Sequence, residues 1–122
     1  MVNRAAIISY IEGEAMRIRK KIDDVSTHDA ELITSVSDAL AHPVRLQLFR
    51  FIMQKNKAME LVCTGDLVEN FDYAQATISQ HMNKLTVAGL VDTRKKDKYT
   101  YYFANIGVLT QYINATKKFA IV

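Results

Sequence analysis

The fold is decided by residues 64–89, which read TGDLVENFDYAQATISQHMNKLTVAG. Thr64 is expected to cap a brief first helix, because its hydroxyl can accept a hydrogen bond from a free backbone N–H. Residues 71–73 then predict a turn, and a second helix is expected over residues 74–88, where Gly89 ends it. The stretch therefore predicts a helix, a turn and a helix in close succession.

The helix expected over residues 74–88 has two distinct faces when its residues are placed at intervals of about 100°. The inner, mostly apolar face comprises Ala74, Ile78, His81, Met82 and Leu85. The outer face and its edges carry hydroxyls, amides and one cation but no carboxylate, and comprise Gln75, Ala76, Thr77, Ser79, Gln80, Asn83 and Lys84. Amides can pair with adenine edges and hydroxyls with phosphates or bases, whereas phosphates would repel carboxylates. We therefore predict that this face contacts DNA; an ordinary solvent-facing helix is the alternative.

Residues 90–103 predict a two-stranded β-hairpin. Leu90–Lys95 and Lys98–Phe103 are rich in β-branched and aromatic residues, with Lys96-Asp97 between them. Four cations cluster near the tip: Arg94, Lys95, Lys96 and Lys98. Beside the candidate DNA-reading helix, such a cluster can contact phosphates or the minor groove. A charged turn that only keeps the protein soluble is the alternative.

Helices are expected on both sides of this unit, over residues 3–22, 29–41, 43–54 and 106–119. Pro43 suits the first position of a helix, because its missing N–H would be unpaired there anyway. The buried stripe of that helix is expected to comprise Leu46, Phe49, Ile52 and Met53. Asn105 can cap the last helix. The element order predicts a mainly α fold with a small β-hairpin, which is the order of a winged helix-turn-helix.

Length and composition limit the remaining possibilities. The chain has 122 residues, a length that predicts one domain over residues 1–122. Its net charge is +3. Residues 23–38 carry acids and no Lys or Arg, whereas bases outnumber acids in residues 73–118, so one face can meet a polyanion. No apolar run approaches the ~20 residues that cross a bilayer, and no secretory signal is evident, so we expect a cytoplasmic protein without a membrane partner.

Several stretches resemble ArsR/SmtB-type bacterial regulators. They are ALAHPVRL at 39–46, ELVCTGDL at 60–67, AQATISQHM at 74–82, AGLV at 88–91 and YTYYF at 99–103. The resemblance covers about residues 36–119, in order and at the expected spacing. It implies a homodimer with terminal helices at the interface, a recognition helix at 74–88, and repression that an effector releases.

The implied interface uses apolar stripes of the first and last helices. These are Ile8, Ile11, Ala15, Ile18, Ile22, Leu109, Tyr112 and Ile113. A first helix lying on a membrane surface is the rival, because residues 17–21 are basic, but Glu12 and Glu14 on the same segment oppose it. We therefore expect residues 3–22 and 105–119 to be dimerisation helices, flanking a helix-turn-helix at 64–88 and a wing at 90–103.

The chain departs from the family pattern at the recognition helix. Ala74 and Ala76 stand where relatives often have Ser, and Asn83 where they have a base. Ala74 cannot cap the helix, so Asp72 and Gln75 are expected to form a reciprocal capping box. Gln75 would then be less free to read a base, which places the expected base contacts on Thr77, Ser79 and Gln80.

No sensing site emerges clearly. Relatives sense metals through paired cysteines near Cys63 or through Asp/His pairs on the last helix, but Gly65 replaces the second cysteine and residues 106–119 contain no His, Asp, Glu or Cys. We therefore expect no metal and no cofactor. His81 is interpreted as a hydrogen-bonded structural residue. Cys63 precedes a short helix, which favours reactive thiols, so a redox role competes with that of a small buried apolar residue.

The sequence thus predicts a sequence-specific DNA-binding transcriptional regulator, a repressor that binds a pseudo-palindromic operator as a homodimer. The effector is open. The alternatives are a winged-helix protein-interaction module without DNA binding, and a thiol-responsive regulator that uses Cys63. An enzyme is not expected, because no nucleophile–base pair, carboxylate dyad or Gly-rich phosphate loop is present.

Overall fold

The computed structural model describes residue 5 and residues 26–120. Its elements, in order, are α2 (Thr27–Leu40), α3 (Pro43–Lys57), α4 (Thr64–Asn70), α5 (Gln75–Val87), β1 (Val91–Lys96), β2 (Tyr99–Ala104) and α6 (Ile106–Ala120). The predicted mainly α fold with a small hairpin is confirmed. Apart from Ala5, the helix expected over residues 3–22 lies outside the described residues, and so do its interface residues Ile8, Ile11, Ala15, Ile18 and Ile22.

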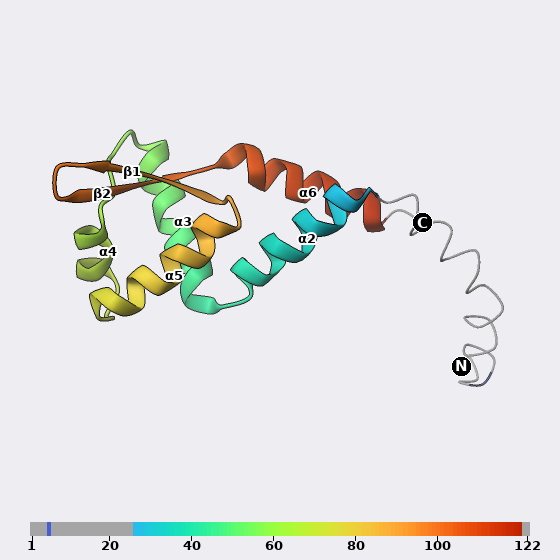
Figure 1. Cartoon of the computed structure of the whole chain (residues 1–122), viewed down its shortest axis with the longest axis horizontal. Helices are drawn as coiled ribbons and strands as arrows, with labels where there is room; N and C mark the ends of the chain where they lie inside the picture. Colours follow the sequence, from blue (N-terminus) through green and yellow to red (C-terminus); the bar gives the residue numbers. More distant parts are fainter. Residues whose placement is uncertain (1–4, 6–25, 121–122) are drawn as a thin grey trace.

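Two parts can be distinguished in Figure 1. The head comprises residues 43–104, in which α3, α4 and α5 pack together beside the β-hairpin. The arm comprises α2 and α6, which lie side by side and project from the head. The two parts meet where the last turns of α2 enter the core of the head, because Val36 and Ala39 are buried there.

The core of the head is formed by apolar side chains from every element of the head and from the end of α2. Its members are Val36, Ala39, Leu48, Phe49, Ile52, Val62, Leu67, Ile78, Met82, Leu85, Leu90, Val91 and Tyr102. Phe49 and Ile52 confirm the predicted stripe of α3. Leu46, by contrast, is 49% exposed, and Leu48 is buried instead. The prediction was wrong there because α3 packs against α5, β2 and α2 at once, so its buried face is turned toward Leu48.

The junction between α2 and α3 is held by polar contacts. Pro43 is the first residue of α3, as predicted, and the Nδ1 atom of His42 accepts a hydrogen bond from the backbone N–H of Val44 at 3.1 Å. The Arg45 guanidinium donates to the carbonyl oxygens of Ala39 at 2.7 Å and Asp38 at 3.1 Å. A cation at the carboxyl end of a helix is favourable, so Arg45 ties the end of the arm to the head.

The hairpin is shifted by one residue from its expected bounds. β1 and β2 are antiparallel, with Val91 opposite Ala104 and Lys96 opposite Tyr99. The turn has Asp97 at φ 58°, a conformation that Asp tolerates better than most residues. Leu90 lies between α5 and β1 rather than in the strand, and its N–H donates to the Leu85 carbonyl after Gly89 at φ 80°.

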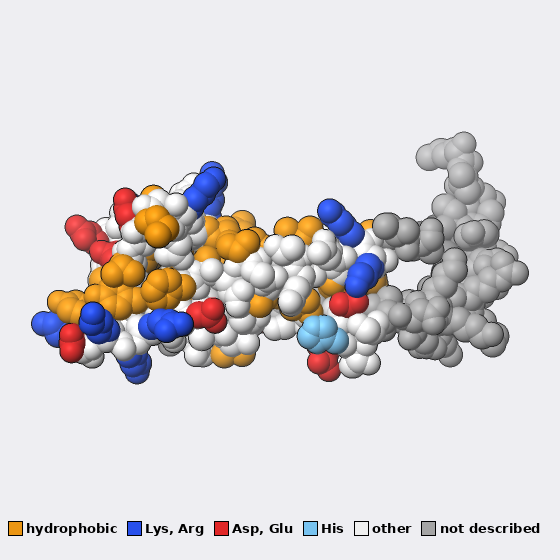
Figure 2. All heavy atoms as spheres, turned by 90° about the horizontal axis from the view of Figure 1, so that it is seen from above, with side chains coloured by type: hydrophobic (Ala, Val, Ile, Leu, Met, Phe, Trp, Pro, Cys, Tyr) orange, Lys and Arg blue, Asp and Glu red, His pale blue; other side chains and the backbone are white. Residues whose placement is uncertain are grey.

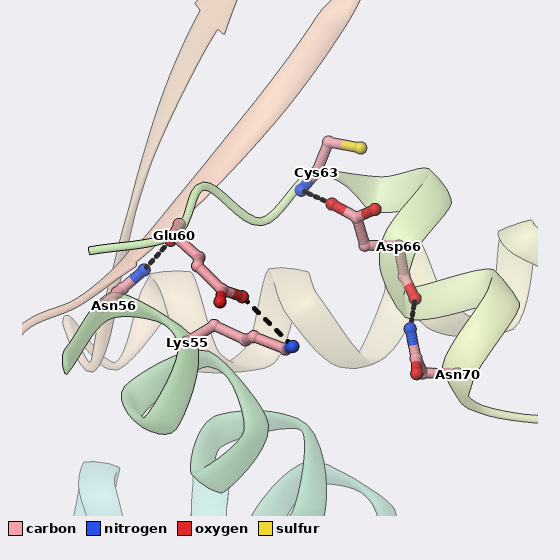
Figure 3. Close-up of polar contacts among 6 residues, drawn as sticks. All are labelled: Lys55, Asn56, Glu60, Cys63, Asp66 and Asn70. Atoms are coloured by element: carbon pink, nitrogen blue, oxygen red, sulfur yellow. Dashed lines mark hydrogen bonds and ion pairs between the residues drawn. The ribbon is translucent and has the colours of Figure 1, made fainter. Parts of the chain in front are cut away.

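The segment that leads into α4 lies beside β2. The Val62 carbonyl accepts from the Tyr102 N–H at 2.9 Å. Figure 3 shows how the polar side chains fix this segment: Lys55 pairs with the Glu60 carboxylate at 3.1 Å, and Asn56 donates to the Glu60 carbonyl at 3.4 Å. The Oδ1 atom of the Asn56 side chain accepts a hydrogen bond from the Ala104 N–H at 2.8 Å. The end of α3 and the end of β2 are thereby joined.

The predicted cap of α4 was wrong by one residue. The capping position is Cys63, whose N–H donates to the Asp66 carboxylate at 2.9 Å (Figure 3). Thr64 is already helical, and its hydroxyl lies 2.9 Å from the Tyr102 hydroxyl. The hydroxyl that Thr64 would need in order to cap the helix therefore contacts Tyr102 of the hairpin instead.

Candidate nucleic-acid interface

The inner face of α5 anchors the helix to the head. Ile78, Met82 and Leu85 are buried, as predicted from their spacing. Ala74 precedes the helix and is exposed, so it does not belong to this face. Three large apolar side chains at helical spacing fix the rotation of α5, and this rotation decides which residues point outward.

The outer face of α5 is open along its whole length. Gln75, Ala76, Ser79, Gln80, Asn83 and Lys84 are exposed, and Thr77 is partly buried. The helix contains no Asp or Glu, so the face offers hydroxyls, amides and one ammonium group. Such a surface can meet phosphates and base edges without charge repulsion.

The start of α5 differs from the expected capping box. The capping position is Ala74, no side chain caps the helix, and there is no acid in its first turn. Asp72 lies two residues too early because residues 71–73 remain in the turn, where the Phe71 ring packs edge-on against Phe51 at 5.6 Å. The capping box was therefore a wrong prediction. Gln75 is not engaged in capping, and the first N–H groups of the helix stay available to an anion.

The hairpin carries the predicted cations in exposed positions. Arg94, Lys95, Lys96 and Lys98 are all exposed. Lys98 lies over the Tyr99 ring, with its Nζ atom 5.5 Å from the ring centroid. Figure 2 shows Lys and Arg side chains, with Asp and Glu side chains among them, around the end of the molecule that carries the hairpin. This end therefore has the charge that a phosphate backbone attracts.

A groove of about 340 Å³ joins the helix to the hairpin. Its walls are Ser79, Met82, Asn83 and Thr86 from α5, and Thr93, Lys95, Thr100 and Tyr102 from the hairpin. Sequence reasoning missed Thr86 and the three hairpin residues other than Lys95. The three hairpin residues could have been predicted from the strand repeat. Thr93 and Lys95 are two residues apart and so share one face of a strand, as do Thr100 and Tyr102. The outer face of α5 and the basic hairpin thus form one surface.

His81 contacts a second histidine on the inner side of α5. The centroids of the His81 and His42 rings are 4.6 Å apart, with an interplanar angle of 46°. The pKa of His81 is lowered from its ordinary value of 6.5, chiefly by burial, then by His42 and Arg45. Within residues 26–120, this ring contact takes the place of the hydrogen bond that the sequence suggested.

The structure offers little for metal binding among the residues it describes. In residues 26–120 no group of three or more His, Cys, Asp or Glu side chains is placed to hold a metal ion. Cys63 is partly buried beside β2, where it forms a backbone bridge with Tyr101. No helix in the described part of the chain is both long and apolar enough to span a bilayer. The redox role of Cys63 stays a prediction.

The chain is similar to known regulatory proteins. Residues 42–93 match the family model described as bacterial regulatory protein, arsR family. The transcriptional repressor SdpR of Bacillus subtilis is 30% identical over 82 residues, which are 67% of this chain and 86% of SdpR. The nodulation protein NolR of Rhizobium meliloti is 28% identical over 87 residues, 71% of this chain and 67% of NolR. The crystal structure of NolR from Sinorhizobium fredii superposes with a TM-score of 0.57 at 26% identity, covering 76% of this chain and 88% of that one.

Proposed function

Because the chain belongs to the ArsR family of bacterial regulatory proteins, we propose that it represses transcription by binding a pseudo-palindromic operator as a homodimer. The family consists of transcription regulators rather than enzymes, in agreement with the sequence prediction. The observation that carries the proposal is the continuous surface formed by the carboxylate-free face of α5 and the basic hairpin. A transcription regulator acts where the chromosome lies, so the cytoplasm remains the proposed location.

In the proposed complex α5 enters the major groove. Ser79 and Gln80 point outward from the middle of the helix and Thr77 lies at the edge, so these three are the proposed base-contacting residues. Gln75 joins them, because no capping contact occupies it. The hairpin cations contact phosphates and supply affinity that is independent of sequence.

The arm supplies the proposed dimer interface. Ile106, Ile113 and Phe119 on α6 are 52%, 43% and 60% exposed, although they are large apolar residues. Of the interface residues predicted from sequence that the structure describes, Leu109 and Tyr112 are partly buried and Ile113 is 43% exposed, and all three stay in the proposed interface. Two copies joined through their arms would present two α5 helices to major grooves about 34 Å apart, one turn of DNA.

The test is selection of bound duplexes from a random pool, followed by binding measurements at several salt concentrations. We expect a pseudo-palindromic sequence and a steep loss of affinity with salt. Replacing Lys95, Lys96 and Lys98 with Ala should lower affinity for every duplex and reduce the salt slope by up to about 2.7, or about 0.9 for each lost phosphate contact. Met59→Ala is the control, because Met59 is exposed outside this surface. Weak, salt-independent duplex binding would instead favour a protein-interaction module.

Replacing Gln80 with Ala separates base reading from general affinity. If Gln80 pairs with a base, its loss costs about 1–3 kcal/mol of discrimination at one position of each half-site. Binding to unrelated duplexes should change little. Competition between the selected duplex and single-base variants measures the difference, and an equal loss for all sequences would remove Gln80 from the base-contacting set.

A further inference from the structure

His42 and His81 connect the start of α3 with the inner face of α5. Their ring centroids lie 4.6 Å apart. His81 is flanked in sequence by Gln80, which is exposed on the outer face, and by the buried Met82. His81 therefore contacts the start of α3 from the helix whose opposite side is the proposed DNA-reading surface.

His42 has a second role at this contact. Its Nδ1 atom accepts the hydrogen bond from the Val44 N–H at 3.1 Å and so caps α3. A ring nitrogen can accept only while it carries no proton, which requires the neutral ring with its hydrogen on Nε2. Protonation of His42 fills this acceptor position. The cap of α3 and the neutral state of the ring are therefore linked.

The surroundings of His81 disfavour positive charge on its ring. Within residues 26–120, the groups that act on His81 are His42 and Arg45, and no carboxylate from α2, α4 or β1 acts to offset them. Arg45 is held in place by its hydrogen bonds to the Ala39 and Asp38 carbonyls at the end of α2. Burial and these two groups keep the pKa of His81 below its ordinary value of 6.5.

We propose that the His42–His81 pair positions α5 for DNA binding and that protonation of the pair weakens this binding. A proton on either ring places positive charge between α3 and α5, and a proton on His42 also removes the cap of α3. The strain is relieved when the rings separate, which shifts α5 relative to α3. The inference rests on the proposed function, since it takes α5 as the DNA-reading helix.

The direction of the effect distinguishes this mechanism from simple charge attraction. Added cations near DNA normally strengthen phosphate binding, so acidification alone would raise affinity. The proposed mechanism lowers it. The same pair should also affect folding: below pH 6.5 the unfolded chain takes up a proton that His81 in the folded protein resists, so the contribution of His81 to stability is lost as the pH falls.

The chain contains three histidines, which permits a complete set of variants. Affinity for a duplex selected at about pH 7.5 is measured by fluorescence anisotropy at that pH and at about pH 5.5, at constant ionic strength. We expect the unmodified protein to lose affinity by about fivefold or more on acidification, a typical coupling between two sites. His28→Gln, at an exposed position of α2, should behave identically. His81→Gln and His42→Asn should lose most of the response, and Asn can still cap α3.

The outcomes separate this inference from the proposed function. Equal affinity of the unmodified protein at both pH values, or a full response in both variants, would overturn the role of the pair. Absence of binding at the higher pH would instead contradict the proposed function. In that case, or if a variant does not fold, NMR titration of the free protein decides. Ring signals of His81 and amide signals of α5 should shift together as the pH falls; a change at His81 without α5 shifts would refute the coupling.

Discussion

The head and the arm are stabilised in different ways. Apart from Val36 and Ala39, the buried apolar side chains of the core belong to the head itself, which encloses them between three helices and the hairpin. In the arm, Ala115 is the only buried residue of α6, while Ile106, Ile113 and Phe119 remain exposed. The head encloses a buried core of its own, whereas α6 carries three exposed large apolar side chains and one buried residue. The proposed DNA contact and the proposed assembly therefore use different parts of one chain.

The largest expected effect lies in the core of the head. Leu85 is fully buried on the inner face of α5, so Leu85→Ala should cost about 2–5 kcal/mol of the free energy of unfolding through lost burial and the cavity that remains. Urea denaturation measures the loss. The matched control is Val87→Ala on the same helix, because Val87 is 77% exposed and its truncation should change stability by less than about 0.5 kcal/mol. Similar losses for the two variants would contradict the assigned rotation of α5.

A smaller effect, of a different kind, is expected in the arm. Ile113→Asp places a charge on the exposed apolar face of α6 and should weaken association by at least about tenfold, equivalent to about 1.4 kcal/mol. Sedimentation equilibrium measures the association constant. Met59→Glu is the control, since Met59 is 92% exposed on the head and should leave association unchanged. If Ile113→Asp associates as the unmodified protein does, the dimer forms through another surface.

The smallest effect is expected between the two helices of the arm. The Ser37 and Tyr112 hydroxyls lie 3.0 Å apart and form a hydrogen bond between α2 and α6. Tyr112→Phe removes it and should cost about 1 kcal/mol or less, because Ser37 is exposed and water can replace the lost partner. A double-mutant cycle with Ser37→Ala isolates the pairwise energy. A coupling of zero would leave apolar packing as the main link between α2 and α6.

Sequence reasoning succeeded where a single repeat in the spacing of apolar residues determines the structure. The faces of α5 follow from the 3.6-residue repeat, which places Ile78, Met82 and Leu85 together and leaves Ser79 and Gln80 outside. The basic hairpin followed from residue types and a polar turn, although the bounds of its strands are shifted by one residue. In both cases the decisive interactions are between residues close in sequence.

Sequence reasoning failed where contacts between residues distant in sequence determine the local structure. Thr64 is not a cap because its hydroxyl meets Tyr102, and Asp72 is not a cap because Phe71 packs on Phe51 and extends the turn. Leu46 and Leu48 fit the helical repeat of α3 about equally well, so only packing against several elements selects between them. His42 and His81 are in contact although they are almost forty positions apart in the sequence, and no local sequence pattern predicts this contact.

The hydrogen bonds of Arg45 have a consequence for the geometry of the operator. Because Arg45 belongs to α3 and holds the last carbonyls of α2, it helps to set the angle at which the arm leaves the head. In the proposed dimer, that angle fixes the distance between the two α5 helices and hence the number of base pairs between half-sites. In that dimer, the number of base pairs between half-sites would then depend on one guanidinium group that lies far from the DNA, where the arm joins the head.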